Sequence, residues 1–310
     1  MWTRRLLASP GRKPTNNDII FHLLINCFVH RWHYLSTAVG LPLLAEEERG
    51  MEGGVGCGME RLSVDDISYV LSLTSPADAC RSAAVSAPFR SAAESDNVWA
   101  RFLPSDHRDI VSRAVDPVAF SSKKDLYFLL CNSILIDGGR KSFALEKRSG
   151  AKCYTLSARD LSIIWGDHES YWRWVSLPES RFAEVAELWD VCWLDISGKI
   201  DSGALSSCTA YKAYLIFKLT REAYGFKRPP QQVSVSVGPH IVEDEVCLQP
   251  ENPSVHRVPR ARNDGWMEIE IGDFFVGDGS EGEVTMSFRE VRSMHWKRGL
   301  IVEGIQVRPR

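Results

Sequence analysis

Residues 122–310 alternate repeatedly between apolar and polar side chains, the period expected of strands with one buried face. The clearest apolar runs are Tyr211, Ala213, Leu215, Phe217 and Leu219; Val233, Val235 and Val237; Met267, Ile269 and Ile271; and Val284, Met286 and Phe288. Turn-forming groups separate these runs at residues 137–139, 201–203, 263–265 and 277–279. Clean alternation favours antiparallel sheets, and many short strands of this kind predict a β-sandwich.

Two segments of this region differ from these runs. Residues 124–131 fit either a helix or a strand, because Leu126, Phe128 and Leu130 also alternate. The last predicted strand, residues 300–307, contains Gly304. A glycine inside a strand indicates a β-bulge at that point.

Residues 60–103 have helical spacing instead. Ser63 followed by Asp66 resembles a helix cap, and the apolar residues Ile67, Val70 and Leu71 recur at helical intervals. Pro76 begins a second predicted helix, and a third runs over residues 88–94, before Trp99. Three short helices bury little apolar surface by themselves. Part of that surface is therefore reserved either for a partner or for the neighbouring domain, and the pattern favours neither.

The segments on either side of these helices have no clear periodicity. Residues 1–58 lead into the glycine-rich stretch 51–59 and are predicted to be a flexible leader. Their apolar run, residues 19–29, is interrupted by His22 and Asn26 and is too short to span a bilayer. Residues 104–121 are predicted to be a short, partly ordered linker.

Charge and cysteine usage narrow the functional classes. The 310-residue chain has a formal net charge of −3, and no surplus of Lys and Arg indicates a nucleic-acid partner. The eight cysteines are scattered without a CxxC pair, which fits a reducing compartment, the cytoplasm or the nucleus. We expect no metal, no cofactor and no membrane segment.

Catalytic motifs are also missing from the sequence. Residues 277–282 (GDGSEG) lack the spacing of a nucleophile elbow, and no phosphate-binding glycine loop is followed by Lys and Ser or Thr. The sequence therefore predicts a binding protein and not an enzyme.

Five of the ten tryptophans lie within residues 154–200. Trp189 and Trp193 share one face of a predicted strand over residues 186–200 whose two faces are both apolar, which predicts a central strand and two core side chains. Trp165 and Trp172 flank a polar turn, residues 166–169, where indoles would stack on a sugar ring and Asp167 would accept its hydroxyls. The alternative is a hairpin closed by packed indoles. Trp174 is assigned to neither group.

The helical segment, residues 59–103, resembles an F-box, the motif that docks substrate receptors onto the Skp-type adaptor of SCF-type cullin ubiquitin ligases. Ser63 stands where the family usually has proline. The resemblance implies that the adaptor-binding residues are Leu62, Ile67, Val70, Leu71, Leu73, Pro76, Val85, Phe89 and Trp99.

Residues 122–310 resemble the phloem protein 2, or Nictaba-like, lectin domain. The similarity rests on stretches such as KKDLYFLLC, YWRWVSLPESRFAEVAELWDVCWLDISGKID, DGWMEIEIGDFF and HWKRGLIVEGIQVRP. It implies a jelly-roll-like sandwich that binds glycans, especially those containing N-acetylglucosamine. The family's sugar-contacting tryptophan pair corresponds to Trp165 and Trp172, with Glu283 and Glu290 as further polar contacts.

Together, these features predict an α+β multidomain protein: a leader (1–58), a three-helix F-box (59–103), a linker (104–121) and a lectin sandwich (122–310). The expected function is that of a substrate-recognition subunit of a ubiquitin ligase that binds glycans or glycoprotein targets. Two alternatives remain. One is a lectin that acts without a ligase, and the other is a sandwich that recognises protein surfaces and has lost sugar binding.

Overall fold

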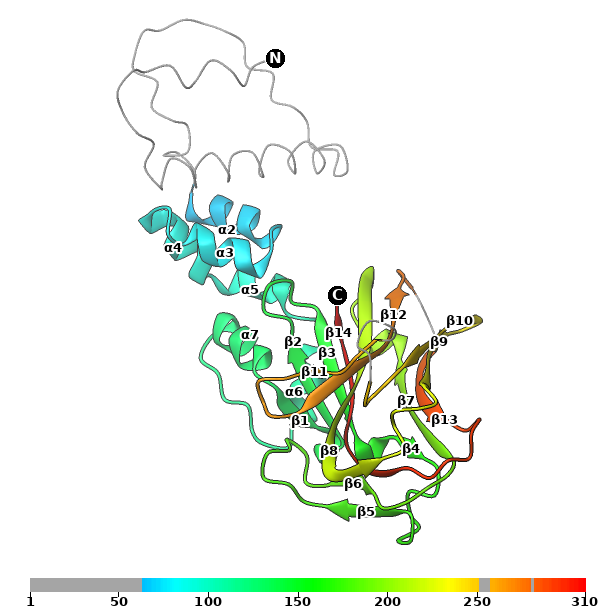
Figure 1. Cartoon of the computed structure of the whole chain (residues 1–310). Helices are drawn as coiled ribbons and strands as arrows, with labels where there is room; N and C mark the ends of the chain where they lie inside the picture. Colours follow the sequence, from blue (N-terminus) through cyan, green and yellow to red (C-terminus); the bar gives the residue numbers. More distant parts are fainter. Residues whose placement is uncertain (1–62, 251–256, 280–281) are drawn as a thin grey trace, which may run out of the picture. The chain divides into compact units, whose positions relative to one another are not determined.

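The computed structural model describes residues 63–250, 257–279 and 282–310. The predicted leader, residues 1–58, and Leu62 lie outside the described residues. Among the described residues, short helices come first in the chain and antiparallel strands follow them (Figure 1). The helices are α2 (Val64–Ser72), α3 (Pro76–Ser82), α4 (Ala87–Glu94), α5 (Asp96–Phe102), α6 (His107–Ser112) and α7 (Lys123–Cys131).

Serine caps define where several of these helices begin. Ser75 accepts a hydrogen bond from the backbone N–H of Asp78, and Ser86 and Ser95 cap α4 and α5 in the same way. Pro76 occupies the first turn of α3, as predicted. The fourth helix of this group, α5, was not predicted, because no proline marks its first turn as Pro76 and Pro88 mark those of α3 and α4.

Trp99 joins this helical group to α7. Its indole N–H donates to the carbonyl of Ala93 at 2.7 Å, and its ring lies 5.1 Å from Tyr127 and 5.3 Å from Phe128. Tyr127 and Phe128 lie on α7, which Ser122 caps through the N–H of Asp125. The ambiguous segment 124–131 is therefore a helix.

The predicted linker is ordered where the structure describes it. Its helix α6 buries Ile110 completely, and Val115 donates its N–H to the carbonyl of Leu135. Asp106 forms a 2.8 Å ion pair with the nearly buried Lys152. Val64–Arg310 form one compact unit, and the domain boundaries at 103 and 121 remain predictions.

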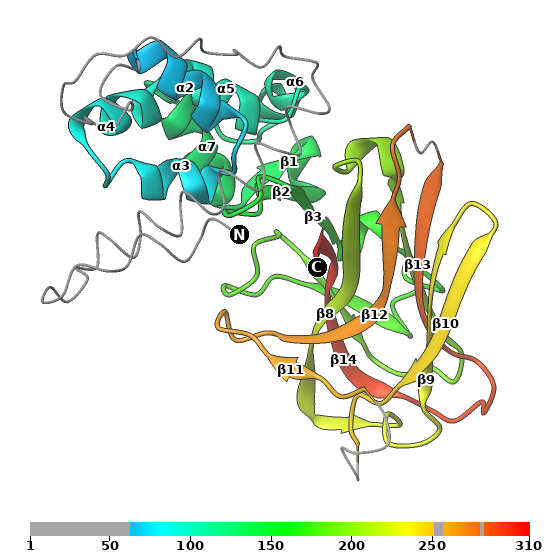
Figure 2. The ribbon, with the colours of Figure 1, turned by 90° about the horizontal axis from the view of Figure 1, so that it is seen from above.

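Within the described residues, strands form two antiparallel sheets, of nine and five strands, that face each other (Figure 2). The nine-stranded sheet has the order β1-β2-β3-β14-β8-β12-β11, and β6 links β5 to β14. Its strands are β1 (Ile134–Ile136), β2 (Lys141–Leu145), β3 (Lys152–Ser157), β5 (Trp172–Val175), β6 (Val185–Leu188), β8 (Thr209–Tyr224), β11 (Arg260–Ala261), β12 (Met267–Val276) and β14 (Arg298–Pro309).

The five-stranded sheet has the order β10-β9-β13-β7-β4. Its strands are β4 (Ser162–Ile163), β7 (Leu194–Asp201), β9 (Gln231–Val237), β10 (His240–Val246) and β13 (Glu283–Glu290). Single-turn 3-10 helices connect some strands, namely η2 (Asp137–Gly139), η3 (Ala158–Asp160) and η4 (Ser202–Ala204). The prediction of an antiparallel sandwich agrees with this architecture.

The predicted alternation matches the buried faces of the strands. Tyr211, Ala213, Leu215 and Phe217 of β8 are completely buried, as are Val284, Met286 and Phe288 of β13. The bulge predicted at Gly304 is confirmed, since the register between β14 and β8 shifts between Val302 and Gly304. A Cβ atom at Gly304 would lie 1.9 Å from the carbonyl oxygen of Leu156, which explains why the position needs glycine.

The prediction of one central strand over residues 186–200 is wrong. The segment contains the end of β6, in the nine-stranded sheet, and β7, in the five-stranded sheet, so the chain crosses between sheets at residues 189–193. Trp189 is half-buried because the guanidinium groups of Arg173 and Arg298 lie 3.5 and 3.9 Å from its ring centroid. Trp193 is 38% exposed. Neither side chain is in the core.

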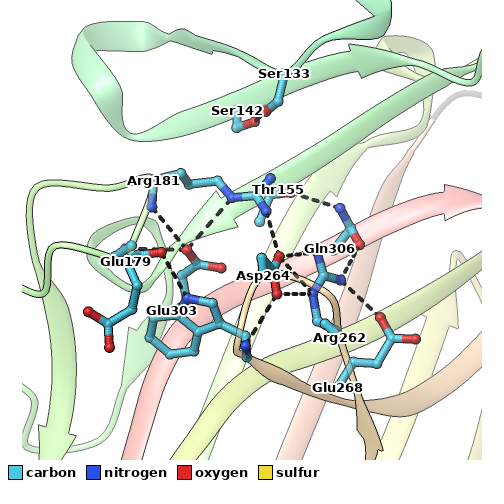
Figure 3. Close-up of polar contacts among 12 residues, drawn as sticks. Ser133, Ser142, Thr155, Glu179, Arg181, Arg262, Asp264, Glu268, Glu303 and Gln306 are labelled. Atoms are coloured by element: carbon cyan, nitrogen blue, oxygen red, sulfur yellow. Dashed lines mark hydrogen bonds and ion pairs between the residues drawn. The ribbon is translucent and has the colours of Figure 1, made fainter.

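Loops and a charged network cover the outer face of the nine-stranded sheet (Figure 3). Arg262 and Arg308 both bind the carboxylate of Glu268, at 2.9 and 2.7 Å. Burial raises the pKa of Glu268, but the hydrogen bonds from Arg308 and Arg262 outweigh it and hold that pKa below its usual value. Beside this network, Trp266 packs with Val185 and Tyr214. This face is therefore closed by structural contacts.

Candidate functional site

Trp165 is displayed by a tight turn at one end of the sandwich. The turn follows β4 and is closed by a 2.9 Å hydrogen bond from the N–H of Gly166 to the carbonyl of Ile163. Trp165 has φ = 54° and is 45% exposed. A bulky residue in the left-handed region costs about 1–3 kcal/mol and is found at ligand-binding sites. The fold thus maintains a strained backbone that directs an indole to solvent.

Trp172 lies beneath this turn. It is only 1% exposed and belongs to the hydrophobic core, and its indole N–H donates to the carbonyl of Ile164 at 3.1 Å. Trp174 is half-buried, donates to the carbonyl of Gly166 at 2.9 Å and lies under the guanidinium group of Arg159. The two-indole sugar platform predicted for Trp165 and Trp172 is not formed in this structure, because the ring of Trp172 packs inside the sandwich.

The polar turn itself surrounds Trp165 with exposed hydrogen-bonding groups. Tyr171 lies 5.3 Å from the Trp165 ring and 4.8 Å from that of His168. Asp167, the next residue but one, is exposed, as its position in the loop predicts. An open indole next to a carboxylate, an imidazole and a phenol has the composition of a sugar-binding site.

The two predicted glutamates lie in different places. Glu283 is at the far end of β13, where it pairs with exposed Lys199 at 2.7 Å. Its register partner on β7 is Asp201, about 23 Å along the strand from Leu194, which lies beside the Trp165 turn. Glu283 is therefore not brought to Trp165.

Glu290 lies at the same end as Trp165 but is buried, with 2% exposure. It forms an ion pair with Lys297, which is completely buried, and accepts a hydrogen bond from the hydroxyl of Ser293. Burial raises the pKa of Glu290, and the contacts with Lys297 and Ser293 lower it further than burial raises it. Glu290 therefore braces the loop between β13 and β14 and does not face solvent.

Two exposed tryptophans were not predicted for this site. Trp193 is 38% exposed and lies two residues before Asp195, whose carbonyl accepts a hydrogen bond from the N–H of Ile164. Trp296 is 54% exposed and lies next to Lys297, which exchanges backbone hydrogen bonds with Val191. Alternation assigned Trp193 to the core, and Trp296 lies between His295 and Lys297 without a periodic pattern. The polar neighbours of Trp296, His295 and Lys297, are the one signal in the sequence that could have indicated a loop there.

Three apolar side chains of the helical segment are open to solvent. They are Val64, Tyr69 and Val85, exposed at 40, 58 and 37%. Of the predicted adaptor-binding residues, Ile67, Leu71, Pro76 and Trp99 are buried, Val70, Leu73 and Phe89 are half-buried, and Val85 is exposed. Among these residues, solvent therefore reaches only the side chains of Val70, Leu73, Val85 and Phe89.

Hollows occur elsewhere on the sandwich. One of about 440 Å³ is lined by Ser149, Ser206, Cys208 and Arg310, and a second of about 420 Å³ lies next to it, at the end opposite Trp165. Neither hollow is lined by a tryptophan, so neither offers an indole that could stack on a sugar ring, and the exposed aromatic residues define the candidate site. Among the described residues, no cluster of potential metal ligands is found, and no helix is long and apolar enough to cross a membrane.

Comparison with known proteins identifies the family. Residues 151–309 match the family model of phloem protein 2. The chain is 44% identical over 273 residues to the Arabidopsis thaliana F-box protein PP2-B15, covering 79% of this chain and 94% of that protein. It is 44% identical over 252 residues to F-box protein PP2-B10 and 41% identical over 273 residues to F-box protein VBF, both from the same plant. Each alignment covers 79% of this chain, with 92 and 97% of the relative. The chain therefore belongs to the plant F-box proteins that carry a phloem protein 2 domain.

Proposed function

We propose that this protein is the substrate-recognition subunit of an SCF-type cullin ubiquitin ligase in the cytoplasm and nucleus. Its helices dock a Skp-type adaptor, and its sandwich binds glycans, including those containing N-acetylglucosamine, on the target. It performs no chemistry itself. The observation that carries the proposal is the exposed, strained Trp165 on a sandwich that follows an F-box-like helical segment in one chain.

The adaptor-docking half rests on exposed apolar side chains of α2 and of the α3–α4 connection, namely Val64, Tyr69 and Val85. Val85 lies at that connection, held by a hydrogen bond from its N–H to the carbonyl of Ser82. Exposed apolar side chains on adjacent short helices are typical of a protein interface, whose centre is depleted in charge. Since Leu71 and Trp99 behind them are completely buried, the helices are held rigid for docking.

Adaptor binding is tested by co-purification of the full chain with a Skp-type adaptor. Val85→Asp places a charge in the proposed interface, and we expect it to abolish the complex. Val115→Asp makes the same change at a 49% exposed valine outside the helical surface and is the matched control. Equal capture of the adaptor by both variants contradicts the docking half of the proposal.

Glycan binding is tested on a glycan array with the full chain. Trp165→Ala removes the exposed indole without touching the core, and we expect it to abolish binding. Phe275→Ala removes an aromatic ring that is 61% exposed at the other end of the sandwich and is the control. An array that stays blank for the wild-type chain, while the adaptor complex forms, would favour a sandwich that recognises protein surfaces instead.

A further inference from the structure

Trp189 carries a cation on each face of its ring. The guanidinium groups of Arg173 and Arg298 lie 3.5 and 3.9 Å from the ring centroid. Two groups so close to one centroid cannot share a face of the ring, because they would overlap. They therefore lie on opposite faces, about 7 Å apart, with the indole stacked between them.

The other tryptophans with a stacked cation, among the described residues, have complete polar contacts. Each of their cations pairs with a carboxylate: Lys124 with Glu94 on Trp99, Arg159 with Glu184 on Trp174, and Lys218 with Glu179 on Trp266. Each of these three indole N–H groups also donates to a backbone carbonyl. In these contacts the charge is neutralised and the donor is satisfied within the chain.

The stack on Trp189 lacks both kinds of contact. Neither guanidinium group forms an ion pair or a hydrogen bond with any residue that the structure describes, and the indole N–H has no acceptor among them. Arg173 is exposed, and Trp189 and Arg298 are half-buried. Two positive charges and a neutral donor are therefore presented to solvent at one place.

Backbone hydrogen bonds hold this stack in position. The N–H of Trp189 donates to the carbonyl of Tyr171, two positions before Arg173, at 2.8 Å. Val191 and Lys297, the residue before the second arginine, exchange two hydrogen bonds of 3.0 and 2.7 Å. Stacking on the indole further restrains both guanidinium groups. A ligand thus meets donors that are already in place, which reduces the entropy lost on binding.

The charge and the number of donor groups match a phosphate monoester. This group carries a charge of about −1.5 to −2 at pH 7 and has three acceptor oxygens, whereas a carboxylate has one charge and two oxygens. Guanidinium groups bind phosphate oxygens through charge-assisted hydrogen bonds of about 2.8 Å. The edge of an aromatic ring is also electropositive, so an anion at the edge of Trp189 is attracted by the indole itself.

Nearby carboxylates indicate which molecule carries the phosphate. Glu187 is the cross-strand neighbour of Arg173, and Asp190 follows Trp189 and accepts hydrogen bonds from the phenol of Tyr224 at 3.1 Å. These negative charges oppose nucleic acids and anionic membranes, which bind to extended positive surfaces. They are compatible with a single phosphate on a chain of neutral or basic residues. A phosphorylated segment of a protein has this composition.

We propose that Arg173, Arg298 and the indole N–H of Trp189 form a binding site for a phosphoserine or phosphothreonine of a target protein. The site makes recognition of the target depend on its phosphorylation. Glycan binding at Trp165 is not needed for this site, because none of the three donor groups belongs to that turn.

The test is titration of the full chain with a short alanine–glycine peptide that has one central phosphoserine, and with the same peptide unphosphorylated. Calorimetry measures affinity, and the indole N–H resonances measured by NMR report the place of binding. The resonance that is missing from Trp189→Phe identifies Trp189. We expect the phosphopeptide to shift that resonance and the unphosphorylated peptide not to bind.

Two substitutions and a matched control test the donors. Arg173→Gln and Arg298→Gln each remove one guanidinium group and should weaken binding of the phosphopeptide about tenfold, a ratio equal to about 1.4 kcal/mol. Arg159→Gln removes a guanidinium group that is stacked on Trp174 but already pairs with Glu184 at 2.8 Å. This control should bind the phosphopeptide like the wild type. Equal melting temperatures establish that the affinity changes report the site.

Several results would overturn the proposal. They are a wild-type chain that does not bind the phosphopeptide, a Trp189 resonance that it does not shift, and unchanged affinity in both Arg173→Gln and Arg298→Gln. If inorganic phosphate binds as tightly as the phosphopeptide, the site takes a free anion and the assignment to a target protein is wrong. Tighter binding to phosphatidylcholine vesicles that contain phosphatidylserine, lost in both variants, would identify a membrane instead. Trp165→Ala on the glycan array tests glycan binding separately.

Discussion

The indole N–H of Trp172 donates a 3.1 Å hydrogen bond to the carbonyl of Ile164, the residue before Trp165. Trp174 donates in the same way, at 2.9 Å, to Gly166, the residue after Trp165. Two indoles of β5 therefore hold both sides of the turn that displays a third. The tryptophans of this region divide into one that faces solvent and two that position it.

Trp172→Phe tests this division, because phenylalanine keeps the ring in the core and removes the donor. Loss of the hydrogen bond together with a small cavity should lower the free energy of unfolding by about 2 kcal/mol. We also expect weaker binding of glycans, since the turn that carries Trp165 loses one of its supports. Chemical denaturation and calorimetry measure the two effects.

Trp266→Phe is the matched control for that experiment. Trp266 is equally buried, and its N–H donates to the carbonyl of Glu179 at 3.2 Å, on the outer face of the nine-stranded sheet. The Trp266→Phe variant should lose a similar free energy of unfolding and keep its affinity for glycans. If both variants bind glycans like the wild type, Trp172 has no role in positioning the turn.

The network of Glu268 with Arg262 and Arg308 makes stability depend on pH. The pKa of Glu268 is lower in the folded chain than its ordinary value of 4.5. The stability that ionised Glu268 contributes to the folded chain is therefore fully present at pH values above 4.5. It is lost as the pH falls through the lower pKa of the folded state. We expect the wild-type chain to lose stability in this acid range, measured by denaturant unfolding at a series of pH values.

Glu268→Gln should remove that part of the acid dependence. At neutral pH it should also cost about 2 kcal/mol, because Arg262 and Arg308 lose the carboxylate that both of them bind. Glu283→Gln changes an exposed ion pair with Lys199 and should cost less than about 0.5 kcal/mol. An unchanged pH profile in Glu268→Gln would contradict the role assigned to this network.

Much of the sandwich could be predicted because alternation reports burial directly. Every second residue of β8 from Tyr211 to Phe217 is buried, and a glycine in β14 indicated its bulge. Both features depend only on one strand and the strand paired with it. They are therefore visible in the local sequence.

The tryptophans could not be sorted in this way, because their burial depends on residues far along the chain. Trp189 looked like a core residue, yet the arginine that covers one of its faces is Arg298, more than one hundred positions away. Trp165 and Trp172 flank the same polar turn, and local sequence does not say which of them points inward. The assignment of a sugar site to Trp165 therefore stays a prediction, and the structure shows only that Trp165 is exposed and that Trp172 is buried.

Gly304→Ala tests the bulge in β14. The new Cβ would meet the carbonyl oxygen of Leu156 at 1.9 Å, and since that neighbour is backbone, the paired strands must separate. Overpacking of this kind costs about 1–3 kcal/mol or more. Gly203→Ala is the control, because its Cβ would meet the carboxylate of Asp201 at an ordinary 3.4 Å. Thermal unfolding should show a large loss for Gly304→Ala and almost none for Gly203→Ala; equal melting temperatures would contradict the prediction.

Leu71 and Tyr69, two residues apart on α2, have different expected roles: Leu71 stabilises the helices, and Tyr69 contacts the adaptor. Leu71 is completely buried and Tyr69 is 58% exposed. Leu71→Ala should destabilise the helices by about 3 kcal/mol through the cavity it leaves, and hydrogen exchange of the α2 amides should speed up accordingly. Tyr69→Ala should leave that exchange unchanged and weaken adaptor binding by removing a contact. If Tyr69→Ala binds the adaptor as tightly as the wild type, the docking surface lies on the half-buried residues Val70, Leu73 and Phe89 and does not reach Tyr69.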